Sequence, residues 1–300
     1  MKKLLLLFLL AFLAVPIASA EESVVTLTTT LDEGASIKLY TWADSMDDAF
    51  TIDWGDGVEK IYNKVKPSWT YGSEITGKLG ASKTITIKGD ITYLEIKEMQ
   101  ISAATFANTK LKEVDMEKNQ LTDFNLSGLP EVTKLSLNEN SIVTFSSTGN
   151  SVLKNLGLKS NKIDSHQFEI SSLANSLEQL NVSENGENFV ALNLINFDKL
   201  QYFTANDNPE LTTVVFYDGS TNLKQISMNN CHIMHFYAIS LPNLNSLNLS
   251  NNALLDFENG TYPNLSTLSV NGNYLSEIDV TKFPKLFSFD CSSNQLTDIN

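Results

Sequence analysis

The sequence predicts a mainly β protein in which a parallel-sheet solenoid follows a small antiparallel β-sandwich. Two observations support this fold class. From residue 91 onward, the pattern apolar-x-x-apolar-x-apolar-x-x-Asn recurs ten times in nearly the same register. Before residue 91 the repeat is absent, and short runs that alternate apolar and polar residues appear instead. A period in the low twenties is typical of stacked coils, and alternation is typical of strands.

The first 20 residues have the layout of a cleaved secretory signal. Lys2 and Lys3 precede a Leu-rich run, which Ala18-Ser19-Ala20 follows. The run is shorter than the ~20 apolar residues of a spanning helix, so cleavage is favoured over a membrane anchor. We therefore expect a secreted or cell-surface protein with no membrane insertion after the signal is removed.

The chain is strongly acidic. Its 300 residues carry 35 Asp and Glu against 21 basic residues, a formal net charge of −14. Every basic residue is a Lys, so the chain lacks the guanidinium group that best forms paired hydrogen bonds to phosphate and guanine. Nucleic acid and anionic membrane surfaces are therefore not expected partners.

Residues 21–90 are expected to form the β-sandwich, which would cap the solenoid. Gly55-Asp56-Gly57 separates two of its alternating runs, and an Asp-Gly pair there predicts a tight hairpin because Gly tolerates positive φ. The Trp-Gly-Asp-Gly sequence that begins at Trp54 resembles the signature of polycystic-kidney-disease-type (PKD) β-sandwich domains. That resemblance implies a fold for this segment and no chemistry. The predicted strands cover residues 24–28, 37–40, 50–54, 58–62 and 84–87.

Residues 91–300 are expected to form ten coils, each with one strand. In the motif that begins at Leu244, Leu247 and Leu249 alternate with polar residues, so apolar side chains point inward and polar ones outward. No single coil could bury that apolar face alone. The chain stops at Asn300, before the second apolar group and Pro of the repeat, so the last coil is expected to be incomplete. The coils begin, at spacings of 20 to 24 residues, at Ile91, Leu111, Val132, Leu153, Leu177, Leu200, Leu223, Leu244, Leu265 and Leu286.

The Asn that ends each motif is predicted to form a structural ladder. The chain turns inward there, and a side-chain amide supplies both donors and acceptors to backbone groups in the dry interior. Met99 and Cys231 replace Asn in the first and seventh coils, and Met99 suggests that the first coil is a junction with the sandwich. The predicted ladder consists of Asn119, Asn140, Asn161, Asn185, Asn208, Asn252, Asn273 and Asn294.

The last motif, Leu286-Phe-Ser-Phe-Asp-Cys-Ser-Ser-Asn-Gln-Leu, resembles the repeats of bacterial leucine-rich-repeat surface proteins, including internalin-like ones. This resemblance covers residues 91–300 and implies contact with a host or neighbouring-cell molecule. A second apolar group, such as Leu275, Ile278 and Val280, follows the Asn within each coil. Coils this short favour extended segments or short 3₁₀ turns on the convex side rather than full α-helices.

The sequence offers no residues for catalysis, for a cofactor or for a metal site. His232 and His235 form an H-x-x-H pair, yet no third ligand is placed to complete a metal site, and His166 is remote. The acidic cluster of Asp44, Asp47 and Asp48 lacks the spacing of a calcium-binding loop, so a solvated loop is favoured over weak Ca²⁺ binding. We expect a protein that is not an enzyme.

The two cysteines are not expected to pair. Cys231 stands at a ladder position, whereas Cys291 stands at an inward position three coils later. At ~4.8 Å per coil that separation is roughly 14 Å, beyond the ~7 Å Cα limit for a disulfide. Both are expected to be buried, unreactive thiols.

The candidate binding surface is the exposed face of the coil strands. We expect a binding or adhesion protein that holds a protein ligand on this face. The face has few of the aromatic or Arg anchors of protein interfaces, so a carbohydrate-binding surface protein and a passive spacer that displays another domain remain as alternatives. We hypothesise that binding centres on Tyr202, near three long coils and the Gly186-Glu187 insertion. The candidate residues are Tyr93, Glu113, Asp115, Lys159, Gln179, Asn181, Tyr202, Thr204 and Asn206.

Overall fold

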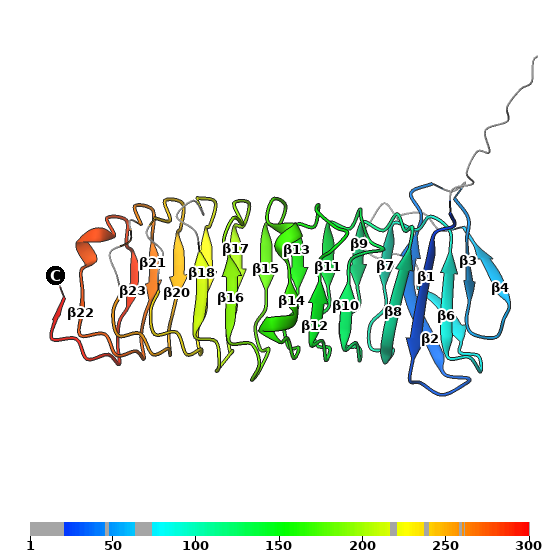
Figure 1. The fold of residues 1–300 in the computed structure, drawn as a ribbon, viewed down its shortest axis with the longest axis horizontal. Helices are drawn as coiled ribbons and strands as arrows, with labels where there is room; N and C mark the ends of the chain where they lie inside the picture. The colour runs from blue at the N-terminus through cyan, green and yellow to red at the C-terminus, as the bar shows by residue number, and fades with distance from the viewer. Residues whose placement is uncertain are drawn as a thin grey trace, which may run out of the picture.

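The structure, a computed structural model, describes residues 21–45, 48–63, 74–216, 221–236, 240–257, 260 and 262–299. These residues form an elongated stack of coils with the N-terminal strands at one end (Figure 1). The expected secretory signal, residues 1–20, lies outside the described residues, as does Asp47 of the acidic loop.

One side of the stack is a twelve-stranded sheet, in the order β23-β21-β20-β19-β17-β15-β13-β11-β9-β7-β2-β5. Coils pair in parallel and in register, so that Leu135 lies between Val114 and Leu156. The central residue of the coil strand is buried from the first coil to the ninth. The predicted parallel-sheet solenoid is thus confirmed. The ten coil strands are β7 (Tyr93–Glu95), β9 (Glu113–Asp115), β11 (Lys134–Ser136), β13 (Asn155–Gly157), β15 (Gln179–Asn181), β17 (Tyr202–Thr204), β19 (Gln225–Ser227), β20 (Ser246–Asn248), β21 (Thr267–Ser269) and β23 (Ser288–Asp290).

The opposite side of each described coil is extended or forms a short 3₁₀ turn, as the coil length predicts. Its strands form separate short sheets, β10-β12-β14, β16-β18 and β22-β24. These strands are β10 (Asp123–Asn125), β12 (Thr144–Ser146), β14 (Phe168–Glu169), β16 (Ala191–Leu194), β18 (Thr213–Phe216), β22 (Glu277–Ile278) and β24 (Asp298–Ile299). The 3₁₀ turns are η1 (Ser165–Gln167), η2 (Ser171–Leu173) and η3 (Val280–Lys282).

The N-terminal strands form an antiparallel sheet, β4-β3-β6-β1-β8, packed beside the start of the long sheet. The expected hairpin joins β3 to β4, and the Asp53 carboxylate accepts hydrogen bonds from the N–H groups of Gly55 (2.8 Å) and Gly57 (3.0 Å). Trp54 is fully buried. The strands are β1 (Val24–Thr29), β2 (Ser36–Trp42), β3 (Phe50–Asp53), β4 (Glu59–Tyr62), β5 (Ile75–Lys78), β6 (Thr84–Lys88) and β8 (Ile101–Ala107).

The first coil joins the N-terminal strands on both sides. Its strand β7 pairs antiparallel with β2, which extends the long sheet, and β8 pairs antiparallel with β1. Neither β5 nor β8 follows from the sequence patterns. One continuous apolar core therefore runs from the N-terminal sheet into the coils.

Candidate functional site

A ladder of asparagines runs along one edge of the coil strands. Asn252 is typical: its Nδ2 donates to the carbonyl oxygens of Met228 in the previous coil (2.7 Å) and Leu249 in its own coil (3.0 Å). Its Oδ1 accepts from the N–H of Ile233 (3.0 Å). Each amide thus ties the backbones of two coils together. Equivalent bonds are made by Asn119, Asn140, Asn161, Asn185, Asn208, Asn273 and Asn294.

The residue before each ladder position has a left-handed backbone conformation. Its φ is 55° at Lys118 and Glu139, 54° at Asn251 and 67° at Gly272. This conformation turns the chain sharply into the ladder, and Gly and Asn adopt it with the least strain. The strand face is therefore bordered by a turn of fixed shape in each of these coils.

Met99 and Cys231, which replace Asn at the ladder position, form different hydrogen bonds. The N–H of Met99 donates to Oδ1 of Asn119 (3.1 Å), and β8 begins two residues later. Cys231 occupies the ladder position of its coil, where its thiol donates to the carbonyl oxygen of Ala205 (3.1 Å). Partial burial raises the pKa of the Cys231 thiol to about 11.

Both cysteines are unpaired, but the expectation that they are buried is wrong. Cys231 and Cys291 are each partly exposed. Cys291 lies in the tenth coil, whose strand β23 pairs with only one other strand, β21 of the ninth coil, among the described residues. At Cys231, a thiol is shorter than the Asn amide and makes fewer bonds to the neighbouring coil.

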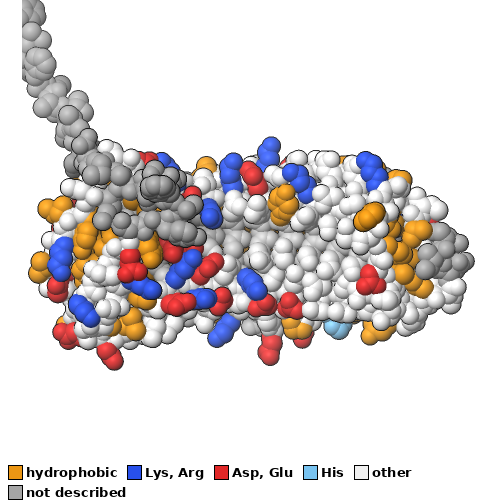
Figure 2. Space-filling view, turned by 180° about the vertical axis from the view of Figure 1, so that it is seen from behind, with side chains coloured by type: hydrophobic (Ala, Val, Ile, Leu, Met, Phe, Trp, Pro, Cys, Tyr) orange, Lys and Arg blue, Asp and Glu red, His pale blue; other side chains and the backbone are white. Residues whose placement is uncertain are grey.

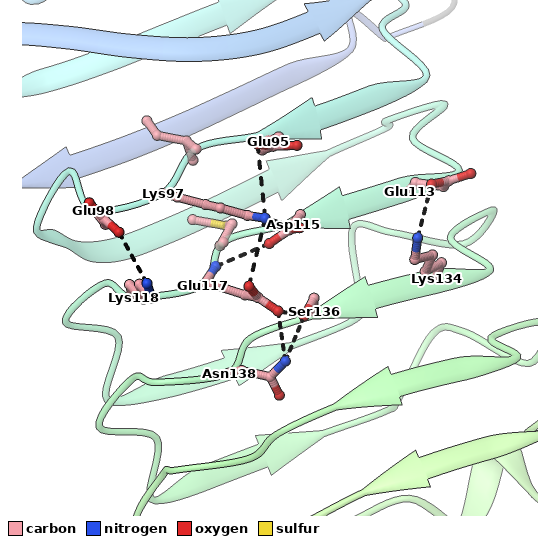
Figure 3. Close-up of polar contacts among 12 residues, drawn as sticks. Glu95, Lys97, Glu98, Glu113, Asp115, Glu117, Lys118, Lys134, Ser136 and Asn138 are labelled. Atoms are coloured by element: carbon pink, nitrogen blue, oxygen red, sulfur yellow. Dashed lines mark hydrogen bonds and ion pairs between the residues drawn. The ribbon is translucent and has the colours of Figure 1, made fainter. Parts of the chain in front are cut away.

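Charged side chains at the N-terminal end of the strand face bind one another. Figure 3 shows Lys97 placed among three carboxylates, with its Nζ 2.6 Å from Asp115, 3.6 Å from Glu117 and 3.9 Å from Glu95. The predicted site residue Tyr93 donates its hydroxyl to Glu95 and stacks on Trp42, with ring centroids 3.8 Å apart. This network leaves little free hydrogen-bonding capacity for a ligand.

The pKa directions in this cluster follow from burial and hydrogen bonds. Burial raises the pKa of Asp115, and the ion pair with Lys97 offsets this only in part. Burial would also raise the pKa of Glu117, but hydrogen bonds from Ser136 and Asn138 lower it below its usual range. The pKa values of these two carboxyl groups on the same face are thus shifted in opposite directions.

The middle of the strand face holds a hollow of about 310 Å³ over β11, β13, β15 and β17. Gly157 lies within it, at an outward position where the neighbouring strands carry Ser136 and Asn181. A Cβ on Gly157 would lie 3.0 Å from Oδ1 of Asn138. Because Gly157 has no side chain, the surface of the strand face lies deeper at this position than at its neighbours, which forms the bottom of the hollow. We call this the Gly157 hollow, lined by Lys134, Leu135, Ser136, Asn155, Leu156, Gly157, Gln179, Leu180, Asn181, Tyr202 and Thr204.

Several polar groups around the Gly157 hollow have no side-chain hydrogen bond to the described part of the chain. These include Asn155, Gln179, Thr204 and the hydroxyl of Tyr202. In contrast, the C-terminal coils satisfy many of their own polar groups, as where the hydroxyl of Ser250 bonds to Asn248 (2.7 Å). Free donors and acceptors thus gather around the hollow.

The structure separates the nine predicted site residues into three groups. Gln179, Asn181, Tyr202 and Thr204 line the Gly157 hollow. Lys159 and Asn206 lie farther along the face, where Lys159 pairs with Glu184 (3.0 Å) and Asn206 accepts from the Ser227 hydroxyl (2.8 Å). The remaining three, Tyr93, Glu113 and Asp115, belong to the N-terminal end of the face.

Sequence reasoning missed Gly157, Lys134 and Ser136 as members of the site. Gly157 could have been found from the register, because it is a glycine at an outward position that polar side chains occupy in neighbouring coils. Figure 2 shows charged side chains gathered toward the N-terminal end of the face it presents, with a largely uncharged stretch farther along.

Within the described ranges, no group of three or more metal-binding side chains occurs, and no helix is long and apolar enough to cross a membrane.

No protein-family model matches the sequence, and no curated protein matches it. Among solved structures, the functional domain of InlJ from Listeria monocytogenes, which includes a cysteine ladder, superposes with a TM-score of 0.59 at 22% identity. The match covers 74% of this chain and 49% of that one. The chain has a leucine-rich-repeat fold. This leucine-rich-repeat chain spans about half the length of the InlJ domain, and its ladder is built mainly from Asn, whereas the InlJ domain includes a cysteine ladder.

Two further solved structures are similar to the leucine-rich-repeat solenoid over part of their length. The internalin InlF from Listeria monocytogenes is 22% identical, covers 69% of each chain and has a TM-score of 0.42. A leucine-rich-repeat protein from Leptospira interrogans is 16% identical, covers 63% of this chain and 68% of its own, and has a TM-score of 0.34. Both TM-scores are too low to indicate the same arrangement of coils.

Proposed function

We propose that this protein is a non-enzymatic binding protein whose strand face holds a protein ligand at the Gly157 hollow. The observation that carries the proposal is the coincidence of a depression with free polar groups on Asn155, Gln179 and Thr204 and with the ring of Tyr202. Interfaces centre on such aromatic anchors in recessed, desolvated positions. The rest of the face supplies a rigid frame, because each strand is fixed to its neighbours by backbone pairing.

Export and attachment belong to the same proposal. The layout of residues 1–20 supports delivery to the cell exterior, where the strand face would meet a host or neighbouring-cell molecule. Residues 21–90 would act as a PKD-like cap that covers the apolar end of the first coil. The pairing of β1 with β8 and of β2 with β7 supports this role.

Binding is tested with variants that fill or strip the hollow. Purified protein is screened against an array of purified extracellular proteins and against a glycan array. Gly157→Leu should abolish binding, whereas Ser269→Leu, at the equivalent position of the ninth coil, should not. Alanine at Tyr202 and Thr204, which line the hollow, should weaken binding, whereas Tyr274→Ala, at an exposed tyrosine outside the coil strands, should not.

The outcomes separate the alternatives. A protein ligand that binds Gly157→Leu as well as the wild type would place the site elsewhere. Hits confined to the glycan array and sensitive to Gly157→Leu would favour the second candidate, a carbohydrate-binding surface protein, which the amides and the Tyr202 ring also suit. If neither the protein array nor the glycan array gives a hit, a passive spacer would be favoured.

A further inference from the structure

The Gly157 hollow differs in charge from the chain that surrounds it. The sequence carries 35 acidic residues, yet none of the residues that line the hollow is an Asp or Glu. Its one charged lining residue is Lys134. Apart from the apolar Leu135, Leu156 and Leu180 and the glycine itself, the other lining residues carry amides or hydroxyls.

Lys134 is only loosely held by its own chain. Its Nζ lies 3.8 Å from Oε2 of Glu113 in the previous coil, beyond hydrogen-bonding distance, and its side chain is 63% exposed. In the same region, the lysines that pair closely do so outside the hollow, as Lys154 does with Glu178 (3.1 Å). The ammonium group of Lys134 is therefore available to a ligand.

A second amine stands beside the far wall of the hollow. The Nζ of Lys224 lies 5.9 Å from the ring centroid of Tyr202 and donates to Oε1 of Gln201 (2.7 Å). Among the described residues, Lys224 forms no ion pair with a carboxylate. Positive charge thus stands on both sides of the neutral donors of Asn155, Gln179 and Tyr202. The nearby carboxylate of Glu117 is already held by Ser136, Asn138 and Lys97, so an anion is the ligand charge that the free groups favour.

We propose that the Gly157 hollow receives a carboxylate side chain, an aspartate or glutamate, of the partner protein. The ammonium of Lys134, the amides of Asn155 and Gln179 and the hydroxyl of Tyr202 supply its hydrogen-bond donors. Gly157 provides the space for the carboxylate to reach them. This inference rests on the proposed binding function and specifies the chemistry of the group that is bound.

The test uses a phage-displayed library of random dodecapeptides panned on the full chain. Bound phage are selected for loss of binding to Gly157→Leu, and the selected peptides are synthesised. We expect every hollow-dependent peptide to contain an Asp or Glu whose change to Asn or Gln weakens binding at least tenfold. A glycan array with acidic and neutral sugars is screened in parallel.

Two variants of the pair at the hollow's edge should move affinity in opposite directions. Lys134→Gln should weaken binding of an acidic peptide by about fivefold, the scale of one exposed ion pair. Glu113→Gln removes the competing carboxylate and should strengthen the same peptide. Neither change should affect the Asn or Gln version of the peptide, which serves as the matched control.

The failures are distinguishable. Hollow-dependent peptides without an acidic residue, or peptides indifferent to both Lys134→Gln and Glu113→Gln, would overturn the carboxylate inference and leave the binding function standing. Acidic sugars that bind the hollow while no peptide does would overturn the inference as well, because the partner would be a glycan. A library that yields no Gly157-dependent peptide, with no glycan bound, would overturn the proposed function itself.

Discussion

The side-chain amide of Asn252 donates to the carbonyl oxygen of Met228, 2.7 Å away in the preceding coil. The same amide accepts from the N–H of Ile233, so one side chain satisfies backbone groups that the turn would otherwise leave buried and unpaired. Repeated along the stack, this relationship holds the spacing of the coils at the edge of the strand face.

Replacing Asn252 by Ala should therefore destabilise the fold. The change leaves buried donors and acceptors without partners, and we expect a loss of about 1–3 kcal/mol in the free energy of unfolding. Chemical denaturation measures it. Asn248→Ala, in the same coil but half-exposed on the strand face, is the control and should cost much less. Equal losses for the two variants would mean that the ladder does not carry the stability assigned to it.

Cys231→Asn should stabilise the protein. An amide at this position would reach the carbonyl oxygen of Ala205, as the thiol does, and would add the acceptor that the thiol supplies only weakly. We expect a gain of about 0.5–1.5 kcal/mol, measured as a higher denaturation midpoint. Cys291→Asn is the matched control: it places an amide at an inward apolar position and should destabilise. A stabilising effect at both sites would contradict the assignment of position 231 to the ladder and of position 291 to an inward apolar position.

The Cys231 thiol should react slowly at neutral pH. With its pKa raised to about 11 by partial burial, only about one part in ten thousand is thiolate at pH 7, and the thiolate is the reactive form. Iodoacetamide labelling followed by peptide mass mapping measures the rate at each cysteine. A rate equal to that of a free thiol in a denatured control would show that Cys231 is not shielded.

Glu117→Gln should reduce stability at neutral pH and have less effect in acid. Hydrogen bonds from Ser136 and Asn138 hold the folded pKa of Glu117 below its ordinary value, against the effect of burial. A carboxyl whose pKa is lowered on folding adds stability above its unfolded pKa, and that stability is lost as the pH falls through the folded pKa. Melting temperatures of wild type and variant should therefore differ more at pH 7 than at pH 3. A difference in melting temperature that is larger at pH 3 than at pH 7 would mean that folding raises the pKa of Glu117 instead of lowering it.

Gly128→Ala should disturb the junction between the N-terminal sheet and the second coil. An added Cβ would lie 1.9 Å from the carbonyl oxygen of Phe106 in β8, a backbone atom that cannot move aside alone. We expect a loss of about 1–3 kcal/mol, as for overpacking in general. Gly157→Ala is the control, because its nearest neighbour at 3.0 Å is the side chain of Asn138. Similar stability for the two variants would argue against tight packing at this junction.

The sequence predicts the coils well because the repeat restricts every coil in the same way. Inward positions such as Leu135 and Leu156 must be apolar, and the ladder position must bind backbone, so period and register can be read directly. Contacts between the N-terminal strands and the first coil are harder to predict from the sequence. The pairing of Val24 with Ala107 joins residues far apart in the sequence, and no local pattern around β8 indicates its partner.

The candidate site is predictable only in part for a related reason. Outward positions carry no packing constraint, so the sequence places Gln179, Asn181, Tyr202 and Thr204 on the face without showing that they surround a depression. The depression depends on Gly157 in one coil and on Lys134 in another. Their proximity follows from the stacking of side chains across coils, which the period alone does not specify.

The parallel register of the long sheet also determines how the molecule responds to tension. Each coil pairs with its neighbours across the stack, so a force applied along the long axis pulls on one coil-to-coil contact after another. Coils of 20 to 24 residues would each release roughly 65–85 Å of chain on rupture, at ~3.3–3.6 Å per extended residue. Under such a load, the protein would lengthen in small, similar steps instead of failing at once.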